Sequence, residues 1–141
     1  MRYVLDSCVA IKWVVPEALR DKALRLRDDG RNAVHEFLAP DAFPLEIGHA
    51  LTRAERQGRI SQADGWTSWQ EVMADAPRLE PSLALMARAY EISSQWRVGI
   101  YDCLYVALSE QESCEFITAD DRLIRNLGQQ FPFIIALSLL P

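Results

Sequence analysis

The chain has 141 residues, half of them hydrophobic and a quarter charged, and its formal net charge is −5. This length and composition predict a single globular domain over residues 1–141, with no internal repeat or low-complexity segment. The cysteines number three and form no C-x-x-C pair, which argues against a disulfide framework and against a structural zinc site.

The first half of the chain alternates between short apolar runs and segments of helical composition. We predict a strand at residues 2–5, helices at 7–14 and 17–29, a strand at 37–39, and helices at 44–57 and 61–74. Pro16, Gly30 and Gly58 are expected to end the first three of these helices.

The second half continues the alternation. We predict a strand at residues 78–80, helices at 81–95 and 100–111, a strand at 115–118, a helix at 120–127 and a last strand at 133–137. Strands that alternate with helices predict an α/β fold of three layers, α/β/α, around a central parallel sheet of about five short strands. Functional sites of such folds lie at the carboxyl ends of the strands.

The apolar stretch at the N-terminus is interrupted by Asp6 and Lys12. It therefore lacks the uninterrupted apolar core of a signal peptide and the length of a membrane span. We expect a cytoplasmic protein that does not associate with membranes.

Four acidic residues stand out by their positions in these elements. Asp6 directly follows the first strand, and Asp120 follows the strand at 115–118. Glu46 and Asp102 each lie in the first turn of a helix and interrupt an apolar stretch. All four are therefore candidates for one site at the carboxyl edge of the sheet.

Each acid also has a local interpretation. Asp6 could cap the helix that follows it, and Thr118 to Asp121 matches a capping box. Several carboxylates at one sheet edge, however, repel one another, and a divalent cation removes that repulsion. Because His35 and His49 are not spaced as a metal motif, the ligands would be oxygens, which select hard cations.

The net negative charge argues mildly against nucleic-acid binding, but the arginines are clustered. One group comprises Arg20, Arg25, Arg27 and Arg31, and another comprises Arg53, Arg56 and Arg59. These groups either contact phosphates or lie on solvated helix faces beside acidic partners. Trp66 and Trp69 are three residues apart, which favours core or interface packing over base stacking.

Three segments resemble the motifs of PIN domains. VLDSCVAIKWVV resembles their opening, in which a strand delivers an Asp followed by Ser or Thr. APDAFPLEIGHAL resembles their second motif, and YDCLYVALSEQESCEFITADDRLIRNL is similar to their third and fourth motifs joined. The resemblance covers nearly the whole chain, and it is strongest to the VapC-type toxins of bacterial toxin–antitoxin pairs.

The resemblance implies a PIN-like fold and a metal-dependent endoribonuclease that cleaves RNA. It implies that Asp6, Glu46, Asp102 and Asp120 are the catalytic and metal-binding acids and that Mg²⁺, or else Mn²⁺, is the cofactor. It also implies that Ser7 and Thr118 support these carboxylates through hydrogen bonds. Two departures are Cys8, where the family has a small or hydroxyl residue, and the doubled Asp120-Asp121, which makes Asp121 an alternative fourth acid.

The expected partners are RNA, a second copy of the chain and a small antitoxin protein, with the protein surfaces formed by apolar residues of the helices between residues 17 and 74. The alternative is a catalytically inactive PIN-like module that only binds such a protein partner. A HAD-like phosphatase is disfavoured because Cys8 stands where that class has its second Asp. A dinucleotide-binding fold is disfavoured because no G-x-G-x-x-G follows the first strand.

Overall fold

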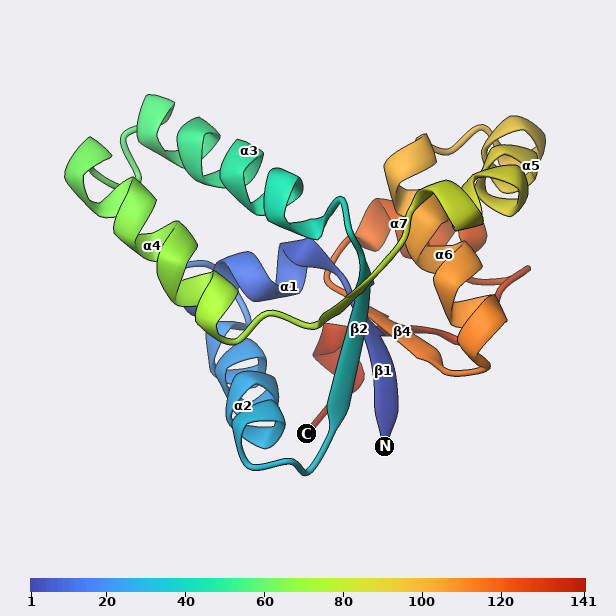
Figure 1. The fold of residues 1–141 in the computed structure, drawn as a ribbon, viewed down its shortest axis with the longest axis horizontal. Coiled ribbons are helices and arrows are strands. Elements are labelled where there is room, and N and C mark those ends of the chain that lie inside the picture. The colour runs from blue at the N-terminus through green and yellow to red at the C-terminus, as the bar shows by residue number, and fades with distance from the viewer.

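The computed structural model describes all 141 residues, and strands alternate with helices along them (Figure 1). The strands are β1 (Arg2–Leu5), β2 (Glu36–Pro40), β3 (Arg78–Glu80), β4 (Glu115–Thr118) and β5 (Ile134–Ala136). The α-helices are α1 (Ser7–Ala10), α2 (Arg20–Arg31), α3 (Phe43–Arg56), α4 (Gln62–Ala74), α5 (Met86–Trp96), α6 (Ile100–Glu112) and α7 (Asp121–Leu127). Three short 3₁₀ helices, η1 (Ile11–Trp13), η2 (Leu83–Leu85) and η3 (Leu137–Leu139), complete the chain.

All five strands are parallel, in the order β3-β2-β1-β4-β5, which confirms the predicted α/β class. β1 is the central strand, and its Val4 pairs with Leu38 of β2 on one side and with Phe116 of β4 on the other. These three residues are fully buried. Apolar residues on both faces of a strand are typical of a parallel sheet that helices cover on both sides.

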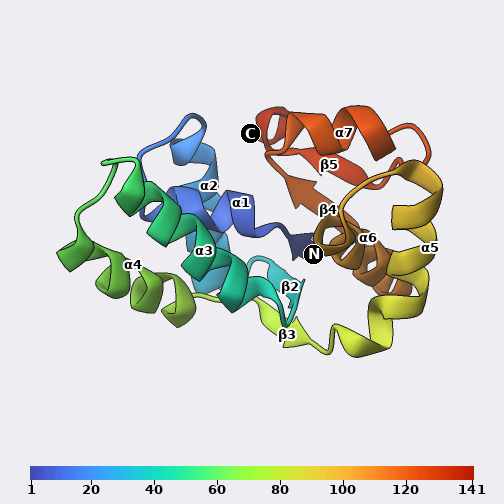
Figure 2. The same ribbon diagram turned by 90° about the horizontal axis from the view of Figure 1, so that it is seen from above.

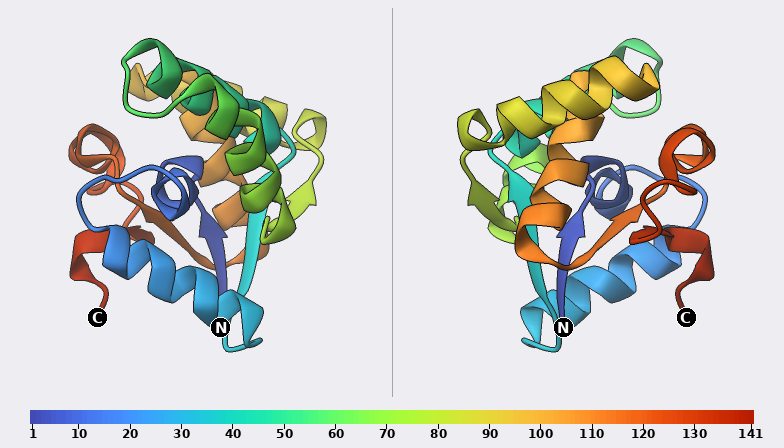
Figure 3. Two further views of the ribbon diagram at one scale, coloured as in Figure 1. Left: turned by 90° about the vertical axis from the view of Figure 1, so that its left-hand side faces the viewer. Right: turned by 90° about the vertical axis from the view of Figure 1, so that its right-hand side faces the viewer.

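Helix α6 lies on one side of the sheet, with α5 packed along it, and α1 and α2 lie on the other side (Figures 1 and 3). Helices α3 and α4 form a hairpin that extends away from the sheet, as the view from above also shows (Figure 2). None of the helices has the length and hydrophobicity that crossing a lipid bilayer requires.

Helix α6 is the most deeply buried helix, because every residue from Cys103 to Ser109 is buried. The Tyr105 ring stacks on Phe116 of β4 with a centroid separation of 5.5 Å. A helix that is apolar on nearly all sides must pack against neighbours all round. The packing of α6 therefore holds the first turn of this helix, which carries Asp102, in a fixed position beside the sheet.

Several predicted helix bounds were wrong for local reasons. The helix predicted to begin at residue 17 starts at Arg20, because Leu19 adopts a left-handed conformation with φ of 65°. Gly30 does not end this helix but lies inside it, where a Cβ would come within 3.1 Å of the Phe37 ring. The single helices predicted at 7–14 and 81–95 each contain a 3₁₀ turn, at η1 and η2. Gly58, with φ of 72°, does follow the end of α3 as predicted.

The prediction that the two tryptophans of α4 serve in core or interface packing is confirmed for Trp69, which packs against the core, but is not tested for the exposed Trp66. The Trp66 and Trp69 rings stack with centroids 4.9 Å apart and planes 6° apart. The Trp69 Nε1 donates a hydrogen bond to the Pro44 carbonyl of α3 at 3.0 Å, which ties the two helices of the hairpin together. Trp66 remains 64% exposed on the outer surface of this hairpin.

Candidate active site

The strand order reverses between β1 and β4, and a cleft opens at their carboxyl ends. The chain leaves β1 toward β2 and leaves β4 toward β5, so the following loops diverge in opposite directions. Ligand sites of open α/β sheets form at this kind of switch point. The cleft has a volume of about 820 Å³, and its walls include Ser7 and Cys8 after β1 and Ala119 and Asp120 after β4.

Asp6 lies at the base of this region and is only 5% exposed. One carboxylate oxygen accepts a hydrogen bond from the Cys8 backbone N–H at 3.3 Å, so Asp6 is the N-cap of α1. The other accepts a bond from the Thr118 hydroxyl at 2.7 Å. Burial raises the pKa of Asp6, the two hydrogen bonds lower it, and the charge of Asp120 raises it further. Asp6 is therefore a buried acid held by partners from α1 and from β4.

Thr118 connects Asp6 to Asp120. Its hydroxyl donates to Asp6 and accepts a hydrogen bond from the Asp120 backbone N–H at 3.1 Å. The alternative interpretation of Thr118 to Asp121 as a capping box is not supported, because Thr118 is the last residue of β4 and its hydroxyl faces Asp6. Asp120 itself caps α7, where its Oδ1 accepts from the N–H groups of Arg122 and Leu123.

Glu46 reaches the cleft wall from the first turn of α3. Its Oε1 accepts a hydrogen bond of 2.7 Å from the hydroxyl of Tyr105, which α6 supplies from the opposite side. Burial raises the pKa of Glu46 to about 7, and the charges of Asp6 and Asp102 add to this shift against the lowering effect of the Tyr105 bond. The geometry thus adds Tyr105, which sequence reasoning missed, as the residue that orients Glu46.

Asp102 lies in the first turn of α6 and is half-buried. Burial raises its pKa to about 7, and the negative charges of Asp6 and Asp120 contribute in the same direction. The four predicted acids are therefore close enough for their charges to act on one another, and the pKa values of Asp6, Glu46 and Asp102 are raised. Asp121, the alternative fourth acid, is exposed and does not line the cleft.

The donor set of these acids fits a hard divalent cation. No group of three or more His, Cys, Asp or Glu side chains is arranged so that it could hold a metal ion. Mg²⁺ does not need one, because it keeps several of its waters and binds proteins through one or two carboxylates. A cation among these carboxylates would offset the burial and the repulsion that raise the pKa values of Asp6, Glu46 and Asp102.

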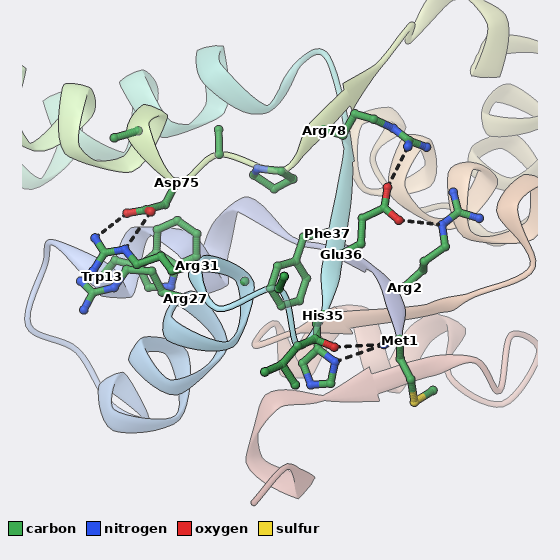
Figure 4. A pocket seen from close by; sticks show the side chains of 16 residues that line it. Met1, Arg2, Trp13, Arg27, Arg31, His35, Glu36, Phe37, Asp75 and Arg78 are labelled. Atoms are coloured by element: carbon green, nitrogen blue, oxygen red, sulfur yellow. Dashed lines mark hydrogen bonds and ion pairs between the residues drawn. The ribbon is translucent and has the colours of Figure 1, made fainter.

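A second cavity, of about 640 Å³, lies at the opposite edge of the sheet (Figure 4). Arg2, Glu36 and Arg78, which line it, are the first residues of β1, β2 and β3. The Glu36 carboxylate lies between Arg2 and Arg78, at 3.5 and 2.7 Å (Figure 4). None of the four candidate acids lines this cavity.

Two arginines of the first predicted group lie at this second cavity and not at the cleft. Arg31 forms a two-bond ion pair with Asp75, at 2.8 and 2.6 Å, and Arg27 pairs with Asp28. These contacts match the alternative in which the arginines lie on solvated helix faces beside acids. They leave Arg27 and Arg31 without a role beside the candidate acids.

Comparison with known proteins gives consistent matches along the chain. The family model "PIN domain" matches residues 3–128. A protein of Mycobacterium tuberculosis named ribonuclease VapC9 is 31% identical over 103 residues, which are 73% of this chain and 80% of that protein.

Two solved structures share the fold. PAE2754 from Pyrobaculum aerophilum superposes with a TM-score of 0.69 at 20% identity and covers 98% of this chain and 93% of that one. VapBC2 from Rickettsia felis, bound to a DNA fragment from its promoter, gives a TM-score of 0.62 at 13% identity and covers 96% and 97%.

Removal of the Thr118 hydroxyl is predicted to destabilise the protein. Thr118→Val keeps the shape of the side chain but leaves Oδ2 of the buried Asp6 carboxylate without its donor. We expect the free energy of unfolding to fall by about 1–3 kcal/mol, measured by urea unfolding at pH 8 with a chelator present. Thr118→Ser keeps the hydroxyl, so its free energy of unfolding should fall by less than that of Thr118→Val. Equal stability of Thr118→Val and the unaltered protein would contradict the prediction.

The raised pKa values predict that the metal-free protein becomes less stable as pH rises. Glu46 and Asp102 shift from ordinary values of 4.5 and 3.8 to about 7, so the folded state binds protons more tightly than the unfolded state. This contribution is fully present below pH ~4 and is lost as pH rises through about 7. Thermal melting with chelator should therefore show a lower Tm at pH 8 than at pH 5.

Asp102→Asn should make this fall in Tm smaller, because one of the titrating groups is gone. Asp121→Asn is the matched control, since Asp121 is exposed and should leave the fall unchanged. A fall in Tm that is just as large in Asp102→Asn as in the unaltered protein would show that the shifted pKa of Asp102 does not govern this stability.

Proposed function

The chain belongs to the PIN-domain family, and we propose that it is a metal-dependent endoribonuclease that hydrolyses RNA phosphodiester bonds as the toxin of a toxin–antitoxin pair. The observation that carries this proposal is that Glu46 and Asp120 line the cleft while Asp6 and Asp102 lie close by: the charges of Asp6 and Asp102 raise the pKa of Glu46, and those of Asp6 and Asp120 raise the pKa of Asp102. The ribonuclease name of the 31% identical relative supports the reaction class.

Asp6 and Asp102 are proposed as direct ligands of Mg²⁺ or Mn²⁺, with Glu46 and Asp120 as further ligands or as partners through water. A bound divalent ion supplies charge neutralisation at the phosphate and makes an attacking water more acidic. The carboxylates come from four different elements, so the fold sets their relative positions. The buried hydroxyls of Thr118 and Tyr105 fix the orientation of Asp6 and Glu46.

Ser7 and Thr118 are proposed as supporting residues. Ser7 lines the cleft, and its hydroxyl lies 3.5 Å from Asp6 Oδ1, so Asp6 is surrounded by donors from Ser7, Cys8 and Thr118. Donors around a carboxylate favour its ionised form, which is the form that binds metal. Partners of this kind keep ligands oriented before the metal arrives.

The proposed substrate is single-stranded or looped RNA, and the proposed protein partners are a second copy of the chain and a small antitoxin. Leu45 and Tyr101 line the cleft and are 76% and 60% exposed. Exposed apolar side chains beside a charged cleft suit contact with a base or with an apolar segment of a partner protein. Occupation of the cleft by an antitoxin would block access to the acids.

Cleavage of a mixed RNA pool by the purified protein is predicted to require Mg²⁺ or Mn²⁺ and to stop in EDTA. Asp102→Asn keeps the shape of the side chain and removes its charge, so we expect a rate loss of about a hundredfold or more. Asp120→Asn should show a similar loss although Asn remains a good helix N-cap. Gel analysis of the cleaved RNA measures both effects.

Asp121→Asn is the matched control for Asp120→Asn, because the two residues are neighbours and only Asp120 lines the cleft. Its cleavage rate should equal that of the unaltered protein. Equal cleavage by all variants would indicate a contaminating nuclease. No cleavage by any of them with either metal would favour the alternative of an inactive module that binds a protein partner.

A homodimer is predicted to form through the helices between residues 17 and 74. Trp66 is the exposed aromatic residue of the α3–α4 hairpin, so Trp66→Glu should shift the protein toward the monomer in sedimentation velocity at micromolar concentration. Tyr90→Glu on α5, where Tyr90 is 66% exposed, is the control and should remain a dimer. A strict monomer before any substitution would end the dimer proposal.

A further inference from the structure

Lys12 is a buried lysine in the wall of the acidic cleft. It lies in η1, six residues after Asp6, and is only 8% exposed. Lysine is almost never buried to this degree without a partner, because removing an ammonium from water is costly. Its presence in the cleft wall therefore calls for a physical explanation.

The ammonium of Lys12 has one partner in the structure. Lys12 Nζ donates to Glu17 Oε1 at 3.2 Å, and Glu17 Oε2 accepts from Arg59 Nη1 at 2.9 Å. An ammonium has three donors, so two of the three donors of Lys12 make no bond to the protein. Glu17 is shared between two cations, and the three groups together carry a net charge of +1.

Lys12 is also the only lysine or arginine that lines the cleft, whereas Glu17, Glu46 and Asp120 contribute negative charge. A ribonuclease must hold phosphates on both sides of the bond that it cuts, and in this cleft the other fixed charges repel them. An ion bound by the acids can neutralise only the phosphate beside it. A neighbouring phosphate needs a cation supplied by the protein.

From these contacts we infer that Lys12 binds an RNA phosphate that neighbours the scissile one, and that Glu17 holds the ammonium in place until the RNA arrives. The inference rests on the proposed ribonuclease function and assigns a phosphate subsite within its cleft. On binding, the Lys12 ammonium exchanges the Glu17 carboxylate for a phosphodiester oxygen, and both acceptors carry one negative charge. Glu17 keeps its second partner, Arg59.

A purely structural role explains the contacts less well. The Lys12 and Glu17 side chains are 11% and 25% exposed, and a partly buried ion pair of this kind is weak support for a fold. A methionine at position 12 would pack a similar unbranched apolar chain without the cost of burying a charge. The structural and the phosphate-binding roles also predict opposite effects of removing Glu17, which makes them separable.

The test measures binding of a fluorescein-labelled single-stranded RNA oligonucleotide by anisotropy, with Ca²⁺ as the cation, over a series of salt concentrations. Lys12→Met should weaken binding about tenfold, because a charged hydrogen bond is lost. The slope of log affinity against log salt should fall by about 0.7, the value for one phosphate contact to a single strand. Lys22→Met is the control and should bind normally, since Lys22 bonds to the carbonyls of Ser138 and Leu140 and does not line the cleft.

Glu17→Gln provides the second arm and does not depend on whether Lys12→Met folds. It frees the ammonium, so RNA should bind more tightly than to the unaltered protein. If Glu17→Gln and Lys12→Met instead both weaken binding and both lower the Tm, the pair is structural and the inference is overturned. Normal binding by Lys12→Met, or no RNA binding by the unaltered protein, overturns it as well.

A cleavage assay on the same proteins with Mg²⁺ separates this inference from the proposed function. Binding that depends on Lys12 in a protein that cleaves no RNA would support the phosphate subsite and reject the catalytic proposal. Cleavage that is normal in Lys12→Met, together with normal binding, would support the catalytic proposal and reject the subsite.

Discussion

The hydrogen bond from Thr118 to Asp6 joins the two strands between which the sheet changes direction. It spans only 2.7 Å and lies in a region where Thr118 is fully buried and Asp6 is 5% exposed. A carboxylate this deep is stable only when donors surround it, and α1 and β4 each provide part of that set. The residues that follow this bonded pair in the chain, Ser7 and Cys8 after Asp6 and Ala119 and Asp120 after Thr118, line the cleft.

The other acids take their positions from that arrangement. Helix α6 is buried on nearly all sides, and its first turn holds Asp102 beside the carboxyl ends of the strands, while Tyr105 from its core reaches across to Glu46. Four carboxylates are thereby placed by elements that cannot separate without breaking the apolar core. Burial, and to a lesser degree repulsion among the carboxylates, raises the pKa values of Asp6, Glu46 and Asp102, and the packing of the core supplies the free energy that holds these acids together.

The sequence predicted the sheet and the four acids because both depend on local patterns. A carboxylate directly after a buried strand must appear at the strand's carboxyl end, whatever the details of packing. The resemblance to PIN domains implied a supporting role for Thr118, whereas no sequence pattern indicated that Tyr105 contacts Glu46. That contact depends on which elements become neighbours, a property of the tertiary fold. For the same reason sequence patterns placed a capping box at Thr118, where the hydroxyl instead pairs with an acid 112 residues away. Both predicted ends of α2 were wrong. Leu19 adopts a left-handed backbone conformation just before the helix, and Gly30 lies inside the helix, packed against the Phe37 ring, and does not end it.

The distribution of charge explains how a chain of net charge −5 can be suited to an anionic substrate. At the amino edge of the sheet the arginines are matched by Glu36 and Asp75, so that edge offers little free positive charge. At the carboxyl edge the acids outnumber Lys12, and under the proposed function attraction for phosphate would arise locally, from cations held by the acids and from the ammonium beside Glu17. Affinity for RNA would then be confined to the cleft, because two of the three donors of the Lys12 ammonium in its wall make no bond to the protein.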